Sequence, residues 1–126
     1  MDAPPDPRVV AVQAEALYLV NLLLMPGLAF LLLLWLNRRH AGSGNRLARC
    51  HLKQTVAASI WAGLLLVAVP GAVVAFVGVE GAATWVVLVL YFVCCHAGMV
   101  LLGVLGLSRA IAGQTYVYPL FGEREC

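Results

Sequence analysis

Three long apolar runs separated by short polar segments dominate the chain. They cover about residues 16–36, 55–77 and 84–107, and none contains Lys, Arg, Asp or Glu. A helix needs roughly 20 apolar residues to cross the hydrocarbon core, where helices satisfy their backbone groups internally. The pattern therefore predicts an all-α integral membrane protein, a single domain over residues 1–126 with three transmembrane helices. The short segment 78–81 between the second and third spans predicts an antiparallel helical hairpin.

The basic residues are unevenly distributed between the two ends of these spans. Five lie in the loop 37–54, which contains no acid, and two more lie in the tail 108–126. Only Arg8 lies on the opposite side. Because Lys and Arg concentrate on the cytoplasmic side of membrane proteins, we expect a cytoplasmic loop and C-terminus and an external N-terminus.

The second half of the basic loop has a polar and an apolar side. Residues 46–54 place Leu47 and Cys50 on one side and the basic residues on another. This predicts a short amphipathic helix on the inner leaflet that leads into the second span. Two interpretations of the loop stay open: it only sets the topology, or it docks anionic lipid or a partner. The basic residues concerned are Arg38, Arg39, Arg46, Arg49 and Lys53.

Three short motifs flank the spans. They are WLNRR at 35–39, HLKQ at 51–54 and GQTYVYPL at 113–120. In order and spacing the chain resembles a widespread family of small, uncharacterised bacterial membrane proteins. That family is related to the helical membrane component of the Tic translocon in the chloroplast inner envelope. The resemblance implies a multi-pass protein of the bacterial inner membrane. The plastid relatives have four spans where three are predicted here, so a translocation role does not follow from it.

The last motif has a physical interpretation of its own. Gly113 suits the left-handed conformation that ends a helix, and Pro119 prevents a helix from resuming. Tyr116 and Tyr118 are amphipathic rings suited to the headgroup level. We expect the tail to fold back along the inner membrane surface near the basic loop, as an interfacial anchor or as a docking edge for a partner.

His96 lies near the middle of the third span, where an ionisable side chain is costly. We expect a neutral ring that donates one N–H, and the Leu22 carbonyl, freed by Pro26, is a candidate acceptor. Packing or such a hydrogen bond is one interpretation, and haem b or quinone binding through His96 is another. His51 is predicted at the cytoplasmic surface, roughly 15–20 Å away in depth, too far to be a second haem ligand.

Small residues gather on the third span at Gly98, Gly103 and Gly106. Small residues let helices approach closely in lipid. Either this face closes the hairpin internally, or part of it docks another membrane subunit or a second copy of the chain. Cys50 and Cys126 are both predicted on the cytoplasmic side, where thiols stay reduced.

Composition narrows the class of function. The chain is 63% hydrophobic and 11% charged, and its net charge of +2 gives no reason to expect nucleic-acid binding. No catalytic or metal-binding motif is visible, so we expect no enzyme activity and no required cofactor. The leading hypothesis is a non-enzymatic accessory or scaffold subunit of an inner-membrane complex. The alternatives are a redox-associated subunit that uses His96 and, less favoured, a translocon-like or transport component.

Overall fold

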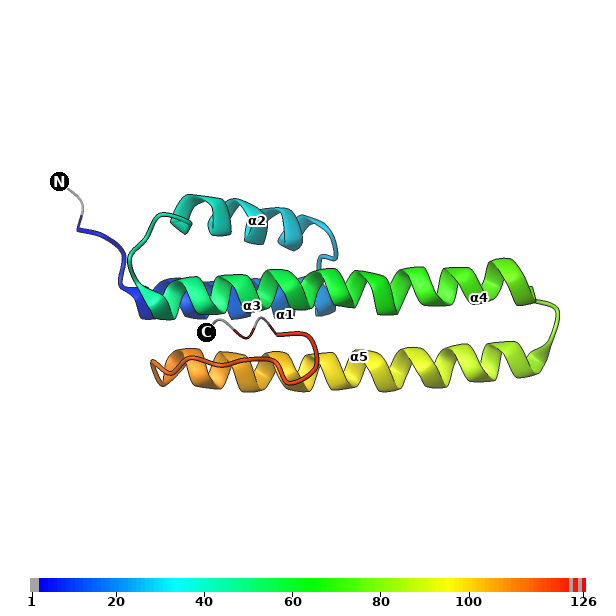
Figure 1. Cartoon of the computed structure of the whole chain (residues 1–126). Helices are drawn as coiled ribbons and strands as arrows, with labels where there is room; N and C mark the ends of the chain where they lie inside the picture. Colours follow the sequence, from blue (N-terminus) through cyan, green and yellow to red (C-terminus); the bar gives the residue numbers. More distant parts are fainter. Residues whose placement is uncertain (1–2, 123, 125) are drawn as a thin grey trace.

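The fold is a long antiparallel pair of helices with two shorter helices packed against one half of it (Figure 1). The computed structural model describes residues 3–122, 124 and 126, and this part of the chain contains helices and no strands. The elements are α1 (Pro7–Leu23), α2 (Leu28–His40), α3 (Arg46–Gly63), the π-helical segment η1 (Leu64–Ala68), α4 (Val69–Val77) and α5 (Ala82–Ile111). Helices α3 and α4 run continuously through η1, and the turn after α4 returns the chain along α5 (Figure 1). The predicted hairpin is confirmed.

The first apolar run is two helices rather than one. Helix α1 ends at Leu23, α2 begins at Leu28, and the two pack side by side. Pro26 lacks an N–H and crowds the preceding turn, while Gly27 takes a φ of 88°, which strongly favours glycine. The prediction of one continuous helix over 16–36 is therefore wrong. The reversal also places the start of α1 and Cys126 in the same half of the long hairpin (Figure 1).

The backbone groups freed by this reversal find partners nearby. The Gly27 N–H donates to Asn21 Oδ1 over 2.9 Å, and His96 Nε2 lies 3.1 Å from the Leu22 carbonyl oxygen. The N–H groups of Leu24 and Met25 both donate to the Val20 carbonyl. The predicted hydrogen bond between His96 and Leu22 is confirmed. The reversal thus meets the requirement that irregular backbone in an apolar setting be satisfied by protein groups.

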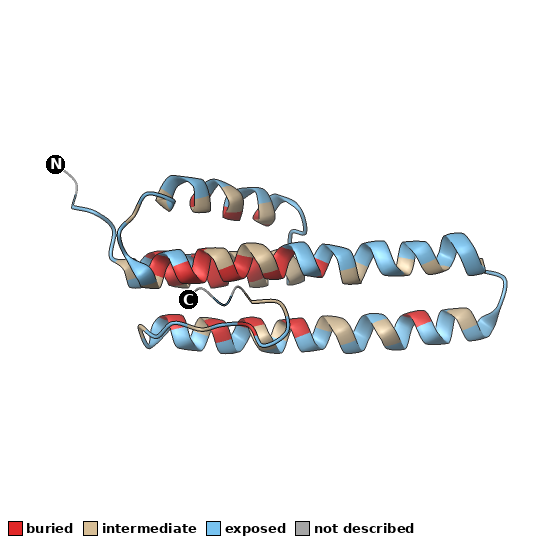
Figure 2. Ribbon diagram, viewed as in Figure 1, coloured by how far each residue is buried: buried red, intermediate tan, exposed pale blue. Residues whose placement is uncertain are grey.

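Buried residues lie almost entirely in one half of the molecule (Figure 2). We call this the proximal half: α1, α2, α3, residues 99–111 of α5 and the tail that follows. The distal half is η1, α4 and residues 82–98 of α5. In the distal half, η1 and α4 bury no residue, and Leu88 is the buried residue of 82–98. The proximal half therefore contains the core, whereas the distal half is a pair of apolar helices whose side chains are largely exposed.

The continuous helix formed by α3, η1 and α4 is π-helical at η1, where it enters the distal half. The Val69 N–H donates to the Leu64 carbonyl, which frees the Leu65 carbonyl to accept from Tyr91 Oη at 2.8 Å. Pro70 follows directly and has no N–H to give. Pro70 interrupts the regular backbone hydrogen bonding of the helix. The π-helical turn and the hydrogen bond from Tyr91 together accommodate this interruption.

Two helical stretches are long and apolar enough to cross a membrane: Arg46–Val77, with 32 residues, and Ala82–Ile111, with 30. At 1.5 Å per residue each is roughly 45–48 Å long, against a hydrocarbon core of about 30 Å. The most apolar windows of the two stretches are only 6% and 17% buried. Such exposure is unlike the core helix of a water-soluble domain, whose apolar face is covered.

Candidate functional site: a buried polar centre and an apolar cavity

A carboxylate lies at the centre of the proximal half. Glu15 on α1 is fully buried, at 0% exposure, and so is His51 on α3. Glu15 Oε1 lies 2.6 Å from His51 Nδ1, and Glu15 Oε2 accepts a hydrogen bond of 2.7 Å from Tyr118 Oη. Because the two oxygens accept from α3 and from the tail, one side chain links three segments of the chain.

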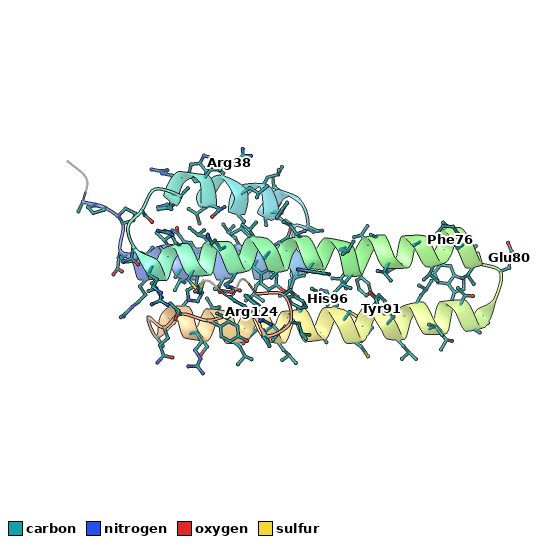
Figure 3. The ribbon with its side chains drawn as sticks, in the orientation of Figure 1. Arg38, Phe76, Glu80, Tyr91, His96 and Arg124 are labelled. Atoms are coloured by element: carbon teal, nitrogen blue, oxygen red, sulfur yellow. A yellow bond between two sulfur atoms is a disulfide. The ribbon has the colours of Figure 1, made fainter. Side chains whose placement is uncertain are left out.

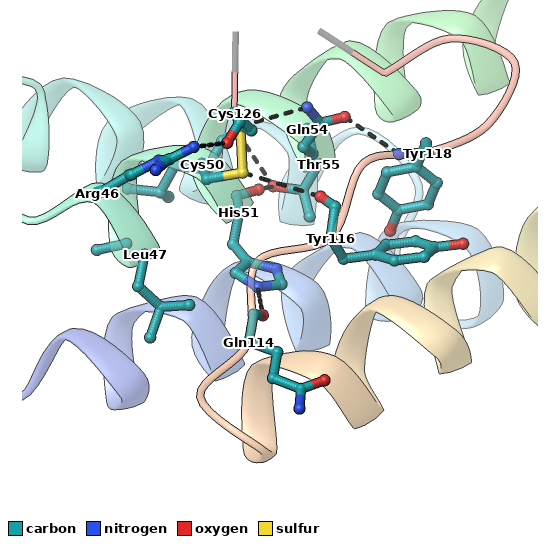
Figure 4. Close-up of a disulfide and its surroundings, with 12 residues drawn as sticks. Arg46, Leu47, Cys50, His51, Gln54, Thr55, Gln114, Tyr116, Tyr118 and Cys126 are labelled. Carbon is teal, nitrogen blue, oxygen red and sulfur yellow. Dashed lines mark hydrogen bonds between the residues drawn. A yellow bond between two sulfur atoms is a disulfide. The ribbon is translucent and has the colours of Figure 1, made fainter. Parts of the chain in front are cut away.

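His51 is held through both ring nitrogens. Nε2 lies 2.8 Å from the Gln114 carbonyl oxygen, which can only accept, so Nε2 carries a proton (Figure 4). Nδ1 faces Glu15. This environment suits an imidazolium paired with a carboxylate. The prediction that His51 lies at the level of the cytoplasmic surface stays a prediction, and the structure adds that the tail and α1 bury its ring.

Tyr118 fixes the tail to this centre. Burial raises the pKa of its hydroxyl, and the neighbouring Glu15 carboxylate raises it further, so the hydroxyl keeps its proton and donates. Its ring packs edge-on against Tyr18 at 5.7 Å, and its backbone N–H donates to Gln54 Oε1 at 3.3 Å (Figure 4). Tyr118 is therefore a core residue. The interpretation of Tyr118 as a headgroup anchor is wrong, while Tyr116 beside it is half-buried.

Two glycines of α5 give α1 room to approach. A Cβ at Gly106 would lie 2.5 Å from Glu15 Oε2, and a Cβ at Gly103 would lie 2.7 Å from Leu19 Cδ2. Close packing of this kind uses small residues within the chain itself. The structure therefore places Gly103 and Gly106 inside the protein. Gly98 has nothing within 4 Å of a built Cβ and lies on the exposed surface.

A disulfide joins the end of the tail to α3. Cys50 and Cys126 are bonded with their Cα atoms 5.5 Å apart, and the Arg46 guanidinium donates to the main-chain oxygen of Cys126 (Figure 4). The expectation of two free thiols does not agree with this arrangement. The two cysteines are 76 residues apart, and only the tail folding back over α3 brings them together.

Each side-chain polar atom of Glu15 and His51 has a protein partner at hydrogen-bond distance. Within the described ranges, no group of three His, Cys, Asp or Glu residues is placed to hold a metal ion. A buried ion pair of this kind is a poor source of net stability, but removing one partner is costly because a charge is left unpaired. We interpret the centre as the group that specifies how α1, α3 and the tail pack.

A second feature lies beside the reversal between α1 and α2. It is an apolar cavity of about 560 Å³, with His96 and Phe92 stacked in its wall at a ring separation of 5.6 Å. Because the Leu22 carbonyl engages His96 Nε2, the nitrogen usual for haem ligation is occupied, and the arrangement does not fit haem iron. The cavity is lined by Asn21, Leu22, Pro26, Gly27, Phe30, Ser59, Ile60, Ala62, Gly63, Leu66, Val67, Phe92 and His96.

The predicted basic residues lie at the proximal end of the molecule. Arg38 and Arg39 are exposed, and the Arg39 guanidinium stacks over the Trp35 ring at 5.1 Å. Three more line a surface pocket of about 330 Å³ beside the disulfide, namely Arg46, Arg49 and Lys53. The apolar side of segment 46–54 packs against α1, α2 and the tail rather than facing a leaflet. The segment is the first part of α3, and Asn45 caps it.

The sequence analysis gave Glu15 no role, because it lies just before the first predicted span, which begins at about residue 16. A signal was nevertheless present, since Glu15 shares a helical face with Val10, Ala11, Ala14 and Tyr18, which are all buried. A carboxylate on the buried face of an amphipathic helix needs a partner. Two of the motifs behind the family resemblance, 51–54 and 113–120, supply it and contact each other here.

Comparison with known proteins returned no matching family model, no curated protein and no solved structure. The fold and the apolar helices of the chain therefore define the class of protein. It is an all-helical chain with two helices long and apolar enough to cross a membrane.

Proposed function

We propose that this chain is a non-enzymatic accessory subunit of a membrane complex, anchored by the hairpin of α3–α4 and α5 and docking a partner helix along its distal half. The observation that supports this proposal is the exposure of the apolar side chains in the distal half. An apolar groove of about 380 Å³ runs between α4 and α5 there, and its lining includes Gly71, Val74 and Val89. The glycine and the β-branched residues of this lining suit the close packing of another transmembrane helix, and Trp85 and Phe92 add large apolar contacts.

The charge distribution supports an orientation with the proximal end in the cytoplasm. The reversal at Pro26 brings Arg8 close to Gly113, so all eight Lys and Arg residues lie in the proximal half. Glu80 lies at the distal tip, while Arg38 and Arg124 lie in the opposite half (Figure 3). On the positive-inside rule the α1–α2 pair then enters the membrane from the cytoplasmic side and returns to it.

The disulfide instead indicates that the proximal end lies outside the cytoplasm, because cytosolic thiols are normally reduced. The charge distribution acts earlier than the disulfide during assembly of the protein in the membrane. Charge acts while the spans insert, whereas Cys126 is synthesised 76 residues after Cys50. The disulfide then forms after the orientation is fixed, and its formation depends on the redox state of the compartment that contains the tail.

Site-specific photocrosslinking in cells tests the docking surface. A photoreactive residue at Val89 lines the groove, and one at Val86 on the same helix is equally apolar and 58% exposed but is not among the groove residues. We expect discrete protein adducts from Val89 and diffuse or no protein adducts from Val86. Adducts of twice the chain mass would identify a second copy as the partner. Lipid adducts alone at both positions would refute the proposal.

A further inference from the structure

The cavity beside the α1–α2 reversal contains polar groups that the fold does not use. Ser59 is 5% exposed, and its hydroxyl has no hydrogen-bond partner among the described residues. A buried hydroxyl without a partner is costly and needs an explanation. Ser59, Asn21 and His96 are all among the residues that line the cavity, so an otherwise apolar space has three polar side chains in its lining.

The hydrogen-bonding roles of the other two groups follow from their existing bonds. His96 Nε2 donates to the Leu22 carbonyl, so in a neutral ring Nδ1 is left as an acceptor. Asn21 accepts through Oδ1 from the Gly27 N–H, which leaves its NH₂ group to donate. These three side chains of the cavity lining therefore retain two donors, on Asn21 and Ser59, and one acceptor, on His96.

The shape and charge of the cavity restrict its occupant. No charged residue is among its lining, so an ionised headgroup or fatty acid would lack a counter-charge. Phe92 and His96 are stacked with their rings 8° from parallel, and Phe30 also lines the space. Its rim includes Val67, which is 71% exposed, so an apolar molecule can enter sideways from the bilayer.

From these observations we propose that the cavity binds a lipid-soluble quinone, a flat uncharged ring with oxygen atoms and an apolar tail. In the oxidised form the ring carbonyls accept from Asn21 and Ser59. In the reduced form a ring hydroxyl donates to His96 Nδ1. The π-helical segment η1 contributes Leu66 and Val67 to the same cavity, and such segments are frequent at functional sites. The proposal goes beyond helix docking and concerns a different surface from the distal groove.

The test uses the purified full-length protein in mild detergent with a decyl-substituted benzoquinone as the probe. Binding is counted by native mass spectrometry and its affinity is followed by the rise in melting temperature. Gly63 lines the cavity and a Cβ there has nothing within 4 Å, so Gly63→Leu adds a bulky side chain at the cavity wall. Gly98→Leu is the matched control, with the same open space on α5 but outside the cavity lining.

We expect one probe molecule per chain, lost in Gly63→Leu and retained in Gly98→Leu. Ser59→Ala should weaken binding about five- to tenfold, as expected for one lost hydrogen bond, and Ser43→Ala, at the other unpartnered serine, should not. No binding, equal binding in both leucine variants, or equally effective competition by decanol would overturn the proposal, the last by showing a site for any alkyl chain. If Gly63→Leu fails to fold, Ser59→Ala and the decanol competition decide the question. The photocrosslinking result at Val89 does not depend on this outcome.

Discussion

Replacing Gly106 with alanine tests directly whether α1 is held against α5 by close approach. The new Cβ would lie 2.5 Å from Glu15 Oε2, and ordinary contact begins near 3.4 Å, so the carboxylate must retreat by about 0.9 Å. That retreat stretches two hydrogen bonds, of 2.6 Å to His51 and 2.7 Å to Tyr118, toward or beyond the limit for a hydrogen bond. The substitution therefore disturbs the buried ion pair without removing any of its atoms.

The expected magnitude follows from three effects. Overpacking costs about 1–3 kcal/mol, and weakening a buried ion pair adds part of the roughly 3–5 kcal/mol that complete loss of one partner costs. Alanine returns up to about 1 kcal/mol through its higher helix propensity. The net expectation is a destabilisation of about 2–4 kcal/mol. At about 3–5 °C per kcal/mol for a chain of this size, the melting temperature should fall by about 10 °C.

Gly98→Ala on the same helix is the control, because its Cβ meets nothing within 4 Å. It should leave the melting temperature unchanged or raise it slightly. The melting temperature of Gly103→Ala should lie between those of the other two variants, since its Cβ meets the end of the flexible Leu19 side chain and the Tyr18 ring. The assay is thermal unfolding in mild detergent, followed by size-exclusion chromatography of a fluorescent fusion. Equal melting temperatures for Gly106→Ala and Gly98→Ala would refute the close-approach reasoning.

Three further substitutions probe the links between segments. Glu15→Gln keeps the shape of the side chain but leaves the His51 cation unpaired, so the stability in the same thermal assay should fall by about 3 kcal/mol, and an unchanged melting temperature would show that the pair is not ionised. Cys126→Ser should lower the melting temperature in oxidising buffer, by up to about 4 kcal/mol of stability for a loop of this length, and have no effect in reducing buffer. An effect of the same size in both buffers would argue against the disulfide. Tyr91→Phe leaves the Leu65 carbonyl without its donor and should cost about 1 kcal/mol, and a neutral result would mean that the π-helical segment does not need the tyrosine.

The pattern along the chain was sufficient for the features that depend on local sequence. Apolar runs of 20 or more residues predict helices wherever they occur, and the turn at residues 78–81 contains glycine at both ends. Gly113 has a positive φ of 71° after the last helix, as its place in the tail motif indicates. The bond between His96 and the Leu22 carbonyl was also predictable, because a proline in an apolar run frees a carbonyl at a known position.

The reversal at residues 24–27 was decided by tertiary structure. Proline and glycine are both tolerated within transmembrane helices, so the sequence permits a kinked single span as well as two helices. The two-helix form is fixed by partners distant in the sequence, above all His96 on α5, and by the packing of α2 against α3. Neither contact leaves a periodic signal in residues 16–36.

The sequence by itself determined that the chain is helical and apolar, where its long hairpin turns, and that its positive charge is concentrated. Tertiary structure decided which polar residues form the centre. Glu15, His51 and Tyr118 come from three separated segments, and only the folded chain brings them within hydrogen-bond distance. The physical reason is that helix formation depends on residues three or four positions apart, whereas burying a charge requires a partner that can come from anywhere in the chain.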